Sequence, residues 1–178
     1  MPSPSSRDRK ADRRPVRTAT YVGIDPGSSG GLATITRRGD EWVTEAIAIP
    51  GTVADLWAWF ALPDVHYGPM FAVIEKVGGY VRGGGGNVGS AMFKFGCGYG
   101  MLLMALAAAG VPYEEVVPGM WQKGLGVSPR KPTESKTQWK NRLKAKAQAL
   151  FPGVTVTLAV ADALLIAEYC RRKREGTL

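Results

Sequence analysis

Apolar residues along the first fifty positions fall into short runs separated by turn-forming residues. The runs are "TYVGI" (20–24), "GLATIT" (31–36) and "WVTEAIAI" (42–49). Their β-branched residues, with "PGSSGG" and "RRGDE" between them, predict a meander of three antiparallel strands. The later run "MFAVIE", from Met70 to Glu75, is apolar without alternation, which is typical of a central strand buried on both faces.

The remaining apolar positions recur mostly at helical spacing. We expect helices over 52–60, 91–109, 118–125, 134–151 and 160–174, and one short strand over 113–117. The resulting order β-β-β-α-β-α-β-α-α predicts an α/β fold: a mixed five-stranded sheet whose first three strands are antiparallel, with helices on both faces. Ribonuclease H-like folds share this order.

The length and the N-terminal composition predict one folded domain. We expect it over 18–178, preceded by a disordered basic arm over 1–17 that lacks the apolar core of a signal peptide. No segment is expected to span a membrane. The longest apolar stretch, from Met101 to Val111, is far short of the roughly 20 residues required and is expected to be a buried helix. We therefore expect a cytoplasmic protein of a bacterium or a phage-infected host cell.

The net charge indicates the kind of binding partner, and the cysteine count indicates whether disulfides stabilise the fold. A net charge of +8 with a pI near 9.7 indicates nucleic acid or another anionic partner. Two cysteines, Cys97 and Cys170, are too few for a disulfide framework and are expected to be small buried side chains. In the helix expected over 91–109, Gly96, Gly98 and Gly100 would let another backbone approach closely.

A basic segment lies between Arg130 and Lys146. Its seven cations are Arg130, Lys131, Lys136, Lys140, Arg142, Lys144 and Lys146, against one acid, Glu134. Lys136, Lys140 and Lys144 are spaced i, i+4, i+8 and so form one stripe on the predicted helix. Such a stripe repels itself unless phosphates neutralise it, which favours DNA binding over a merely solvated face.

Three carboxylates stand near the ends of predicted elements. Asp25 ends the first strand, Glu75 ends the fourth, and Asp162 lies in the first turn of the last predicted helix. If the first and fourth strands are neighbours, Asp25 and Glu75 emerge at one edge, and the last helix brings Asp162 beside them. Clustered carboxylates repel unless cations neutralise them, and oxygen-only ligands suit Mg²⁺. A pair of such ions would support attack of water on a phosphodiester.

Each carboxylate also has a simpler interpretation. An aspartate before Pro-Gly is a common turn residue, and an acid at the start of a helix is favoured by the helix dipole. Glu75 is harder to explain this way because a charge at the end of a buried strand needs a partner. Taken together, the three favour a metal site, and the glycines around Asp25 would leave room for a DNA backbone.

These residues resemble the RuvC-like Holliday-junction resolvases, in particular their phage-type and chloroplast-type branch. The stretches that carry the resemblance are "GIDPGSSGGLA", "VIEKV", "MFKFGCGYGMLLMAL", "VPGMWQKGLGV", "LKAKAQALFP" and "ADALLIAEY". They follow the family's order from about Tyr21 to Tyr169. "GIDPG" alone is weak, since sugar kinases and chaperone-type ATPases begin with a similar loop, whereas "FKFGCGYG" and "LFP" followed by "ADALLIAEY" are more specific.

The resemblance implies a homodimeric, Mg²⁺-dependent endonuclease that nicks opposed strands of branched DNA, a four-way junction. The nicks would be symmetric and leave 5′-phosphate and 3′-hydroxyl ends. Asp25, Glu75 and Asp162 would hold the metal, with Mn²⁺ as the alternative ion and two ions per site. Lys140 stands where the family has a basic residue ahead of "LFP", and would stabilise the scissile phosphate or its transition state. No nucleotide cofactor is implied.

One departure from the family bears on activity. The family normally has a fourth metal-binding residue, Asp or His, about one turn before the last aspartate, where this chain has Leu158 and Ala159. Three explanations stay open: a three-carboxylate site with more water ligands, help from Ser28 or Thr157, or a junction-binding protein with weak or no nuclease activity. The second ion is the part most affected.

Further DNA contacts are proposed on a glycine-rich loop and elsewhere. Tyr80 and Arg82, in the loop over 78–89, would probe the junction, although a plain connector explains the loop equally well. Lys123 is added as a candidate DNA contact, and Trp121 and Trp139 either stack on bases or pack internally. Another ribonuclease H-like nuclease is a rival assignment. An actin-like ATPase or kinase is disfavoured because it needs two such domains.

Overall fold

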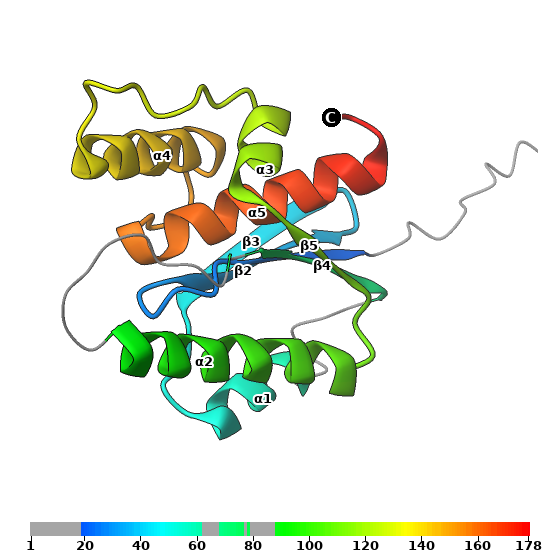
Figure 1. The fold of residues 1–178 in the computed structure, drawn as a ribbon. Coiled ribbons are helices and arrows are strands. Elements are labelled where there is room, and N and C mark those ends of the chain that lie inside the picture. The colour runs from blue at the N-terminus through cyan, green and yellow to red at the C-terminus, as the bar shows by residue number, and fades with distance from the viewer. Residues whose placement is uncertain (1–18, 62–67, 77, 79–87) are drawn as a thin grey trace, which may run out of the picture.

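The computed structural model describes residues 19–61, 68–76, 78 and 88–178 (Figure 1). The expected N-terminal arm and the two loop residues proposed to probe a junction, Tyr80 and Arg82, lie outside these ranges.

One mixed sheet forms the centre of the fold. Its strands are β1 (Thr20–Ile24), β2 (Gly31–Arg38), β3 (Glu41–Ala48), β4 (Met70–Glu75) and β5 (Tyr113–Val116), in the order β3-β2-β1-β4-β5. The first three strands are antiparallel, and β4 runs parallel to both β1 and β5. The register pairs Ile24 with Ile74. Asp25 and Glu75, the next residues along, therefore lie side by side at one end of the sheet, so the condition set for the candidate site is met.

Helices cover both faces of the sheet (Figure 1). On one side lie α3 (Pro118–Gly124), α4 (Lys136–Leu150) and α5 (Leu158–Glu175), and on the other α1 (Val53–Ala61) and α2 (Val88–Ala108). Alternate residues of β1 serve the two layers, because Tyr21 packs in the core cluster with α5 while Val22 and Ile24 pack with α1 and α2. The predicted fold class is confirmed.

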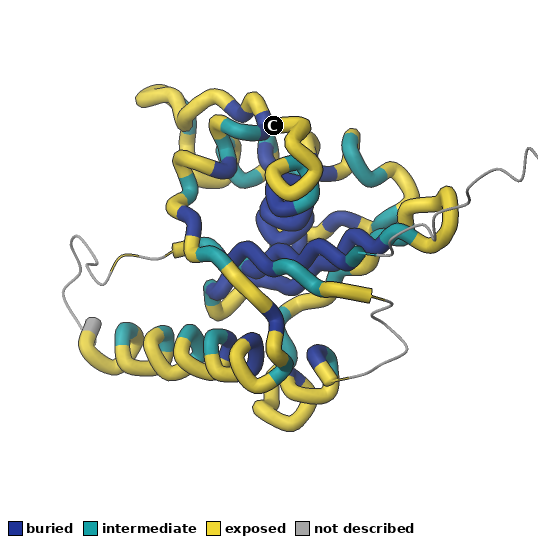
Figure 2. The backbone as a smooth tube through the Cα atoms, turned by 90° about the vertical axis from the view of Figure 1, so that its right-hand side faces the viewer, coloured by how far each residue is buried: buried dark blue, intermediate teal, exposed yellow. Residues whose placement is uncertain are grey.

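Helix α5 is deeply buried over its middle, with every residue from Val160 to Cys170 buried (Figure 2). It lies directly on the sheet because glycines remove the side chains in between. A Cβ on Gly23 would lie 2.2 Å from the Ala163 carbonyl oxygen and from the Ala167 amide nitrogen. A Cβ on Gly31 would lie 2.7 Å from the Ala159 carbonyl oxygen.

The glycines around Asp25 therefore accommodate the protein's own backbone. Besides Gly23 and Gly31, Gly30 sits in a tight turn where a Cβ would lie 2.1 Å from the Asp25 carbonyl oxygen. The interpretation that these three positions leave room for a DNA backbone is wrong.

Helix α2 differs most from its prediction. Phe93 is 73% exposed and Met104 67%, and Cys97 is also exposed, although Cys170 is buried as expected. The helix is longer than the apolar stretch that was expected to be buried. Over Gly89–Ala108 it is long and apolar enough to cross a membrane by length and composition, with 17% of that span buried. The expectation of a buried helix is wrong because only one side of α2 packs on the rest of the fold (Figure 2). The expectation that no segment is long enough to span is wrong because the apolar part of α2 starts before Met101.

Candidate metal and nucleic-acid site

The fold brings the three predicted carboxylates to one end of the sheet. Asp25 follows β1, Glu75 ends β4, and Asp162 comes from α5, which Gly23 allows to lie against β1. Their charges act on one another. Burial and the charge of Asp162 raise the pKa of Asp25. Burial, together with the charges of Asp25 and Asp162, raises the pKa of Glu75 to about 7.

Asp25 is held by the turn that follows it. Its Oδ1 accepts a hydrogen bond from the Gly27 N–H at 3.2 Å, and its backbone exchanges two hydrogen bonds with Gly31. The hydrogen bond from Gly27 is the contact expected of an aspartate in a turn. The half-buried position and the neighbouring Asp162 charge are not required by such a turn, and both raise the free energy of the ionised carboxylate.

Glu75 is oriented by a residue that the sequence did not assign to the site. The indole Nε1–H of Trp121, which is fully buried in α3, donates to Glu75 Oε2 at 2.9 Å. A buried tryptophan usually needs an acceptor for its N–H, so a partner for Trp121 was foreseeable. The sequence does not predict which residue accepts this hydrogen bond, because Glu75 lies 46 positions away from Trp121.

Asp162 is the most buried of the three, with the residue 5% exposed. Helix α5 begins at Leu158 after Thr157 as N-cap, so Asp162 is its fifth residue and lies in the second turn. The prediction of a first-turn position is wrong because the helix starts two residues earlier than expected. The helix-dipole interpretation loses its basis, since that effect falls off within the first turn.

Lys140 of α4 reaches into this cluster. Its ammonium forms an ion pair with Asp162 Oδ2, whereas Asp162 Oδ1 is buried without a hydrogen-bond partner in the described structure. Burial by itself would lower the pKa of Lys140, but the hydrogen bond and charge of Asp162 outweigh it and raise that pKa. The charge of Lys140 also acts on Asp25 and Glu75.

The donor set suits a hard divalent cation. As the side chains stand, no three acidic, histidine or cysteine groups within the described ranges are close enough to share an ion. The carboxylates nevertheless offer only oxygen atoms as ligands, and the Asp162 Oδ1 is buried without a partner. Burial and the neighbouring carboxylate charges raise the pKa values of Asp25 and Glu75, and a bound cation would offset both effects. At the fourth position Leu158 is 49% exposed and apolar, and both Ser28 and Thr157 are exposed.

Comparison with known proteins identifies the fold. No family model matches the chain, and no curated protein matches it either. A structure of Thermus thermophilus RuvC in complex with a Holliday junction substrate is 18% identical, with a TM-score of 0.57, and the match covers 89% of this chain and 97% of that one. Another Thermus thermophilus RuvC structure is 17% identical, with a TM-score of 0.52 and the same coverage. This chain has the ribonuclease H-like fold of RuvC. The phage-type or chloroplast-type branch stays a prediction.

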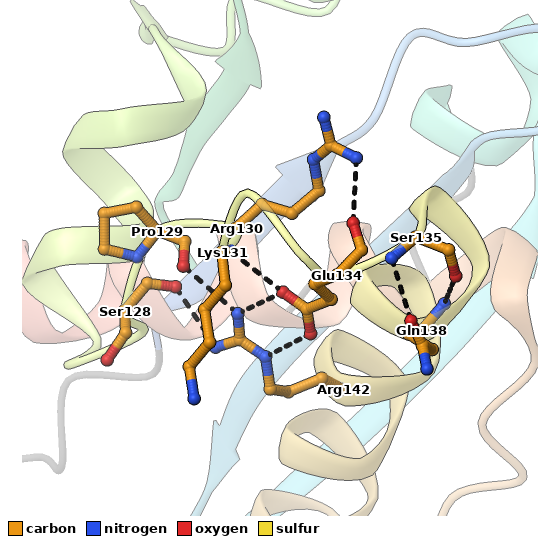
Figure 3. A network of polar contacts seen from close by, with 8 residues as sticks. All are labelled: Ser128, Pro129, Arg130, Lys131, Glu134, Ser135, Gln138 and Arg142. Carbon is orange, nitrogen blue, oxygen red and sulfur yellow. Dashed lines mark hydrogen bonds and ion pairs between the residues drawn. The ribbon is translucent and has the colours of Figure 1, made fainter.

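On this RuvC fold the predicted DNA-contacting lysines have different surroundings. Lys136 and Lys123 are exposed, Lys144 is half-buried, and Lys140 is turned to Asp162. The one acid of the basic segment is paired with one of its seven cations. Arg142 forms an ion pair with Glu134, and this pairing holds the pKa of Glu134 below its usual value (Figure 3). The role of the lysines in DNA binding stays a prediction.

Glu75→Gln is expected to stabilise the metal-free protein at pH 8 and to flatten its pH dependence. The wild-type carboxyl has a pKa of about 7 in the fold against its usual 4.5, so the folded state binds more protons between these values. The free energy of unfolding therefore falls as the pH rises from 4.5 to 7. Glutamine keeps an oxygen for Trp121 without the charge. We expect a gain of about 2 kcal/mol at pH 8 and little change at pH 4.

Urea unfolding in EDTA at both pH values measures this effect. Glu45→Gln, at an exposed position of β3, is the matched control and should leave the pH dependence unchanged. A loss of stability in Glu75→Gln at pH 8 would contradict the prediction.

Proposed function

We propose that this protein is a structure-selective endodeoxyribonuclease that resolves four-way DNA junctions by paired, symmetric nicks. The observation that carries the proposal is the convergence of Asp25, Glu75 and Asp162 at one end of a RuvC-type sheet, with Lys140 beside them. A protein with the same fold has been seen with a Holliday junction substrate, which supports branched DNA as the ligand.

The three carboxylates would hold Mg²⁺, or Mn²⁺ in its place. When bound, the cation supplies positive charge at the phosphate and lowers the pKa of water. Trp121 fixes the orientation of Glu75, and the Gly27 N–H fixes that of Asp25. Lys140 pairs with Asp162 at the edge of this cluster, and its ammonium would stabilise negative charge that develops on a scissile phosphate.

The number of ions follows from the missing fourth ligand. A site that binds two cations needs enough carboxylate ligands to coordinate both of them. Here Leu158 offers no donor atom, so the residues present favour one resident ion with Lys140 as the second positive charge.

The proposal is tested with a synthetic four-way junction in Mg²⁺ or Mn²⁺. We expect nicks at symmetric positions in two opposed strands, with 5′-phosphate and 3′-hydroxyl ends that a ligase can seal, and no nicks in a linear duplex of the same sequence. A junction that is bound but left intact would favour the alternative, a junction-binding protein. Nicks confined to flaps or RNA–DNA hybrids would favour a different ribonuclease H-like nuclease.

We also propose that α2 forms the two-fold contact of a homodimer, because paired nicks need two active sites. Exposed residues recur along one face of the helix at Phe93, Cys97, Gly100 and Met104. Added side chains at Gly96 and Gly100 would meet nothing within 4 Å, so a second helix can approach closely there. An exposed apolar face of this kind marks a protein contact, and a self-complementary contact gives two-fold symmetry.

Met104→Lys is expected to convert the dimer into a monomer, because it places a charge in the apolar contact. Sedimentation at micromolar concentration measures the change, and oxidative cross-linking through Cys97 in the wild type provides a second readout. Met120→Lys is the matched control: Met120 is 55% exposed but belongs to α3, on the other side of the sheet. A wild type that sediments as a monomer would exclude this contact.

A further inference from the structure

We propose that a cationic cavity beside Lys140 binds a phosphate of the DNA strand next to the bond that is cut. The cavity has a volume of about 440 Å³. Its lining residues are Gln122, Pro129, Arg130, Lys136, Trp139 and Lys140. Three of these six are cations and none is acidic. The inference rests on the proposed junction nuclease and names one part of the DNA that the nuclease would hold.

The cavity adjoins the carboxylate cluster through a single side chain. Lys140 lines the cavity, and its ammonium is paired with Asp162. Lys136 lies one helical turn earlier on the same face of α4. Its ammonium has no acidic partner among the residues described. A phosphodiester chain that passes the carboxylates therefore meets uncompensated positive charge directly beside them.

Arg130 is held in place by its own loop (Figure 3). The Arg142 guanidinium donates to the carbonyl oxygens of Ser128 and Pro129, at 3.1 and 3.2 Å. It also donates to both carboxylate oxygens of Glu134, at 2.9 and 2.8 Å. Arg130 in turn donates one of its five N–H groups to the Glu134 carbonyl oxygen at 3.1 Å. These contacts are all made within the protein, so the loop that carries Arg130 is tied to α4 by the protein's own groups.

The same network removes the negative charge that would oppose a phosphate. Glu134 is the one acid in the segment from Arg130 to Lys146, and its carboxylate is engaged by Arg142 and by the Lys131 N–H. Of the cations that line the cavity, Lys140 is paired with Asp162, whereas Arg130 and Lys136 have no acidic partner among the residues described. Cations gathered in this way repel one another, and a phosphate relieves that repulsion.

The uncharged residues that line the cavity favour a nucleotide unit of DNA over an inorganic phosphate ion as the ligand. Trp139 is half-buried, with the Arg142 guanidinium 4.4 Å from its ring centroid. An aromatic side chain beside a phosphate site suits contact with a sugar or a base. The Gln122 side chain adds amide N–H groups that can donate to phosphate oxygens.

The test measures junction binding in EDTA, where nicking does not occur. Fluorescence anisotropy with a labelled four-way junction is recorded over a range of salt concentrations. We expect Arg130→Gln combined with Lys136→Gln to weaken binding about tenfold or more, and to reduce the slope of log K against log salt by about 1 to 2. Lys131→Gln is the matched control, because Lys131 neighbours Arg130 and has the same charge but does not line the cavity. It should bind within about twofold of the wild type.

A second measurement locates the phosphate. Neutral methylphosphonates replace single phosphates around the nick, one at a time. We expect one replacement to lower the junction affinity of the wild type and of the Lys131→Gln variant. The same replacement should leave the affinity of the Arg130→Gln/Lys136→Gln variant unchanged, because the neutral phosphate and the double substitution remove the same contact. Equal thermal midpoints for all variants confirm that folding is unaffected, as the exposure of both side chains predicts.

The outcomes separate this inference from the nuclease itself. If the double variant has the affinity and salt slope of Lys131→Gln, the phosphate site is wrong. If micromolar mononucleotide or inorganic phosphate displaces the junction, the cavity serves a free anion and the inference is also wrong. A wild type that binds the junction but never nicks it in Mg²⁺ or Mn²⁺ overturns the nuclease alone, and a wild type that binds no DNA overturns both.

Discussion

Asp25→Asn is expected to abolish junction nicking while leaving junction binding within about twofold of the wild type. Asparagine keeps an oxygen that can accept the Gly27 N–H, so the turn after β1 should persist. What it removes is the negative charge that would hold a divalent cation beside Glu75 and Asp162. Loss of about 4 kcal/mol of transition-state stabilisation corresponds to a roughly 10³-fold slower nick, which we take as the minimum effect.

Single-turnover nicking in Mg²⁺ measures the rate, and calorimetric titration with Mn²⁺ measures cation binding independently of activity. Asp40→Asn is the control, because that side chain is 98% exposed in the turn between β2 and β3. Undiminished nicking by Asp25→Asn would remove Asp25 from the metal site. Lost nicking with unchanged Mn²⁺ binding would assign Asp25 a role other than holding the cation.

Gly23→Ala is expected to cost at least about 3 kcal/mol of folding stability. The added methyl group would lie 2.2 Å from the Ala163 carbonyl oxygen and from the Ala167 amide nitrogen, both backbone atoms of a buried helix. Neither can move unless α5 shifts as a whole. Such a shift would displace Asp162 from Asp25, so we expect the folded fraction of this variant to bind Mn²⁺ more weakly than the wild type does.

Urea unfolding measures the stability of this variant. Gly119→Ala is the matched control, since a Cβ there meets nothing within 4 Å and Gly119 lies on the exposed side of α3. It should be neutral or slightly stabilising, because alanine is the better helix former. If the two variants were equally stable, the close contact between α5 and β1 would be wrong.

The two predictions concern different parts of one arrangement. Asp25 contributes the charge, and Gly23 two residues earlier lets α5 lie close enough for Asp162 to share that charge. The apolar strand and the glycine-rich turn after it therefore both serve the candidate site. The role of the turn is to close tightly around Asp25.

The elements that the sequence predicted best are those buried on both faces. The bounds of β4 match the prediction to the residue, because its apolar run has no polar interruption and ends at a carboxylate. The adjacent positions of Asp25 and Glu75 were predicted on the condition that the first and fourth strands are neighbours, and the structure meets that condition by pairing β1 with β4. Helix ends were less certain, and the start of α5 was predicted two residues late.

Side-chain partners far apart in the sequence were not predictable. Trp121 contacts Glu75 across 46 positions, and Lys140 contacts Asp162 across 22. Hydrophobic spacing shows which face of a helix is apolar, but it does not show what covers that face, which is why the exposure of α2 was missed. For the same reason the sequence predicted a stripe of lysines on one helix but not the cavity that Lys136 and Lys140 line together with Arg130 of the preceding loop.

By itself the sequence determined the order of the elements along the chain, the fold class and which three acids could form the site, because hydrophobic periodicity and turn residues are local properties of the chain. Only the tertiary structure decided that β1 and β4 are neighbours, that Lys140 pairs with Asp162, which glycines admit the backbone of α5, and which cations share a cavity. Those features depend on distances between elements, and these distances exist only once the helices have packed against the sheet.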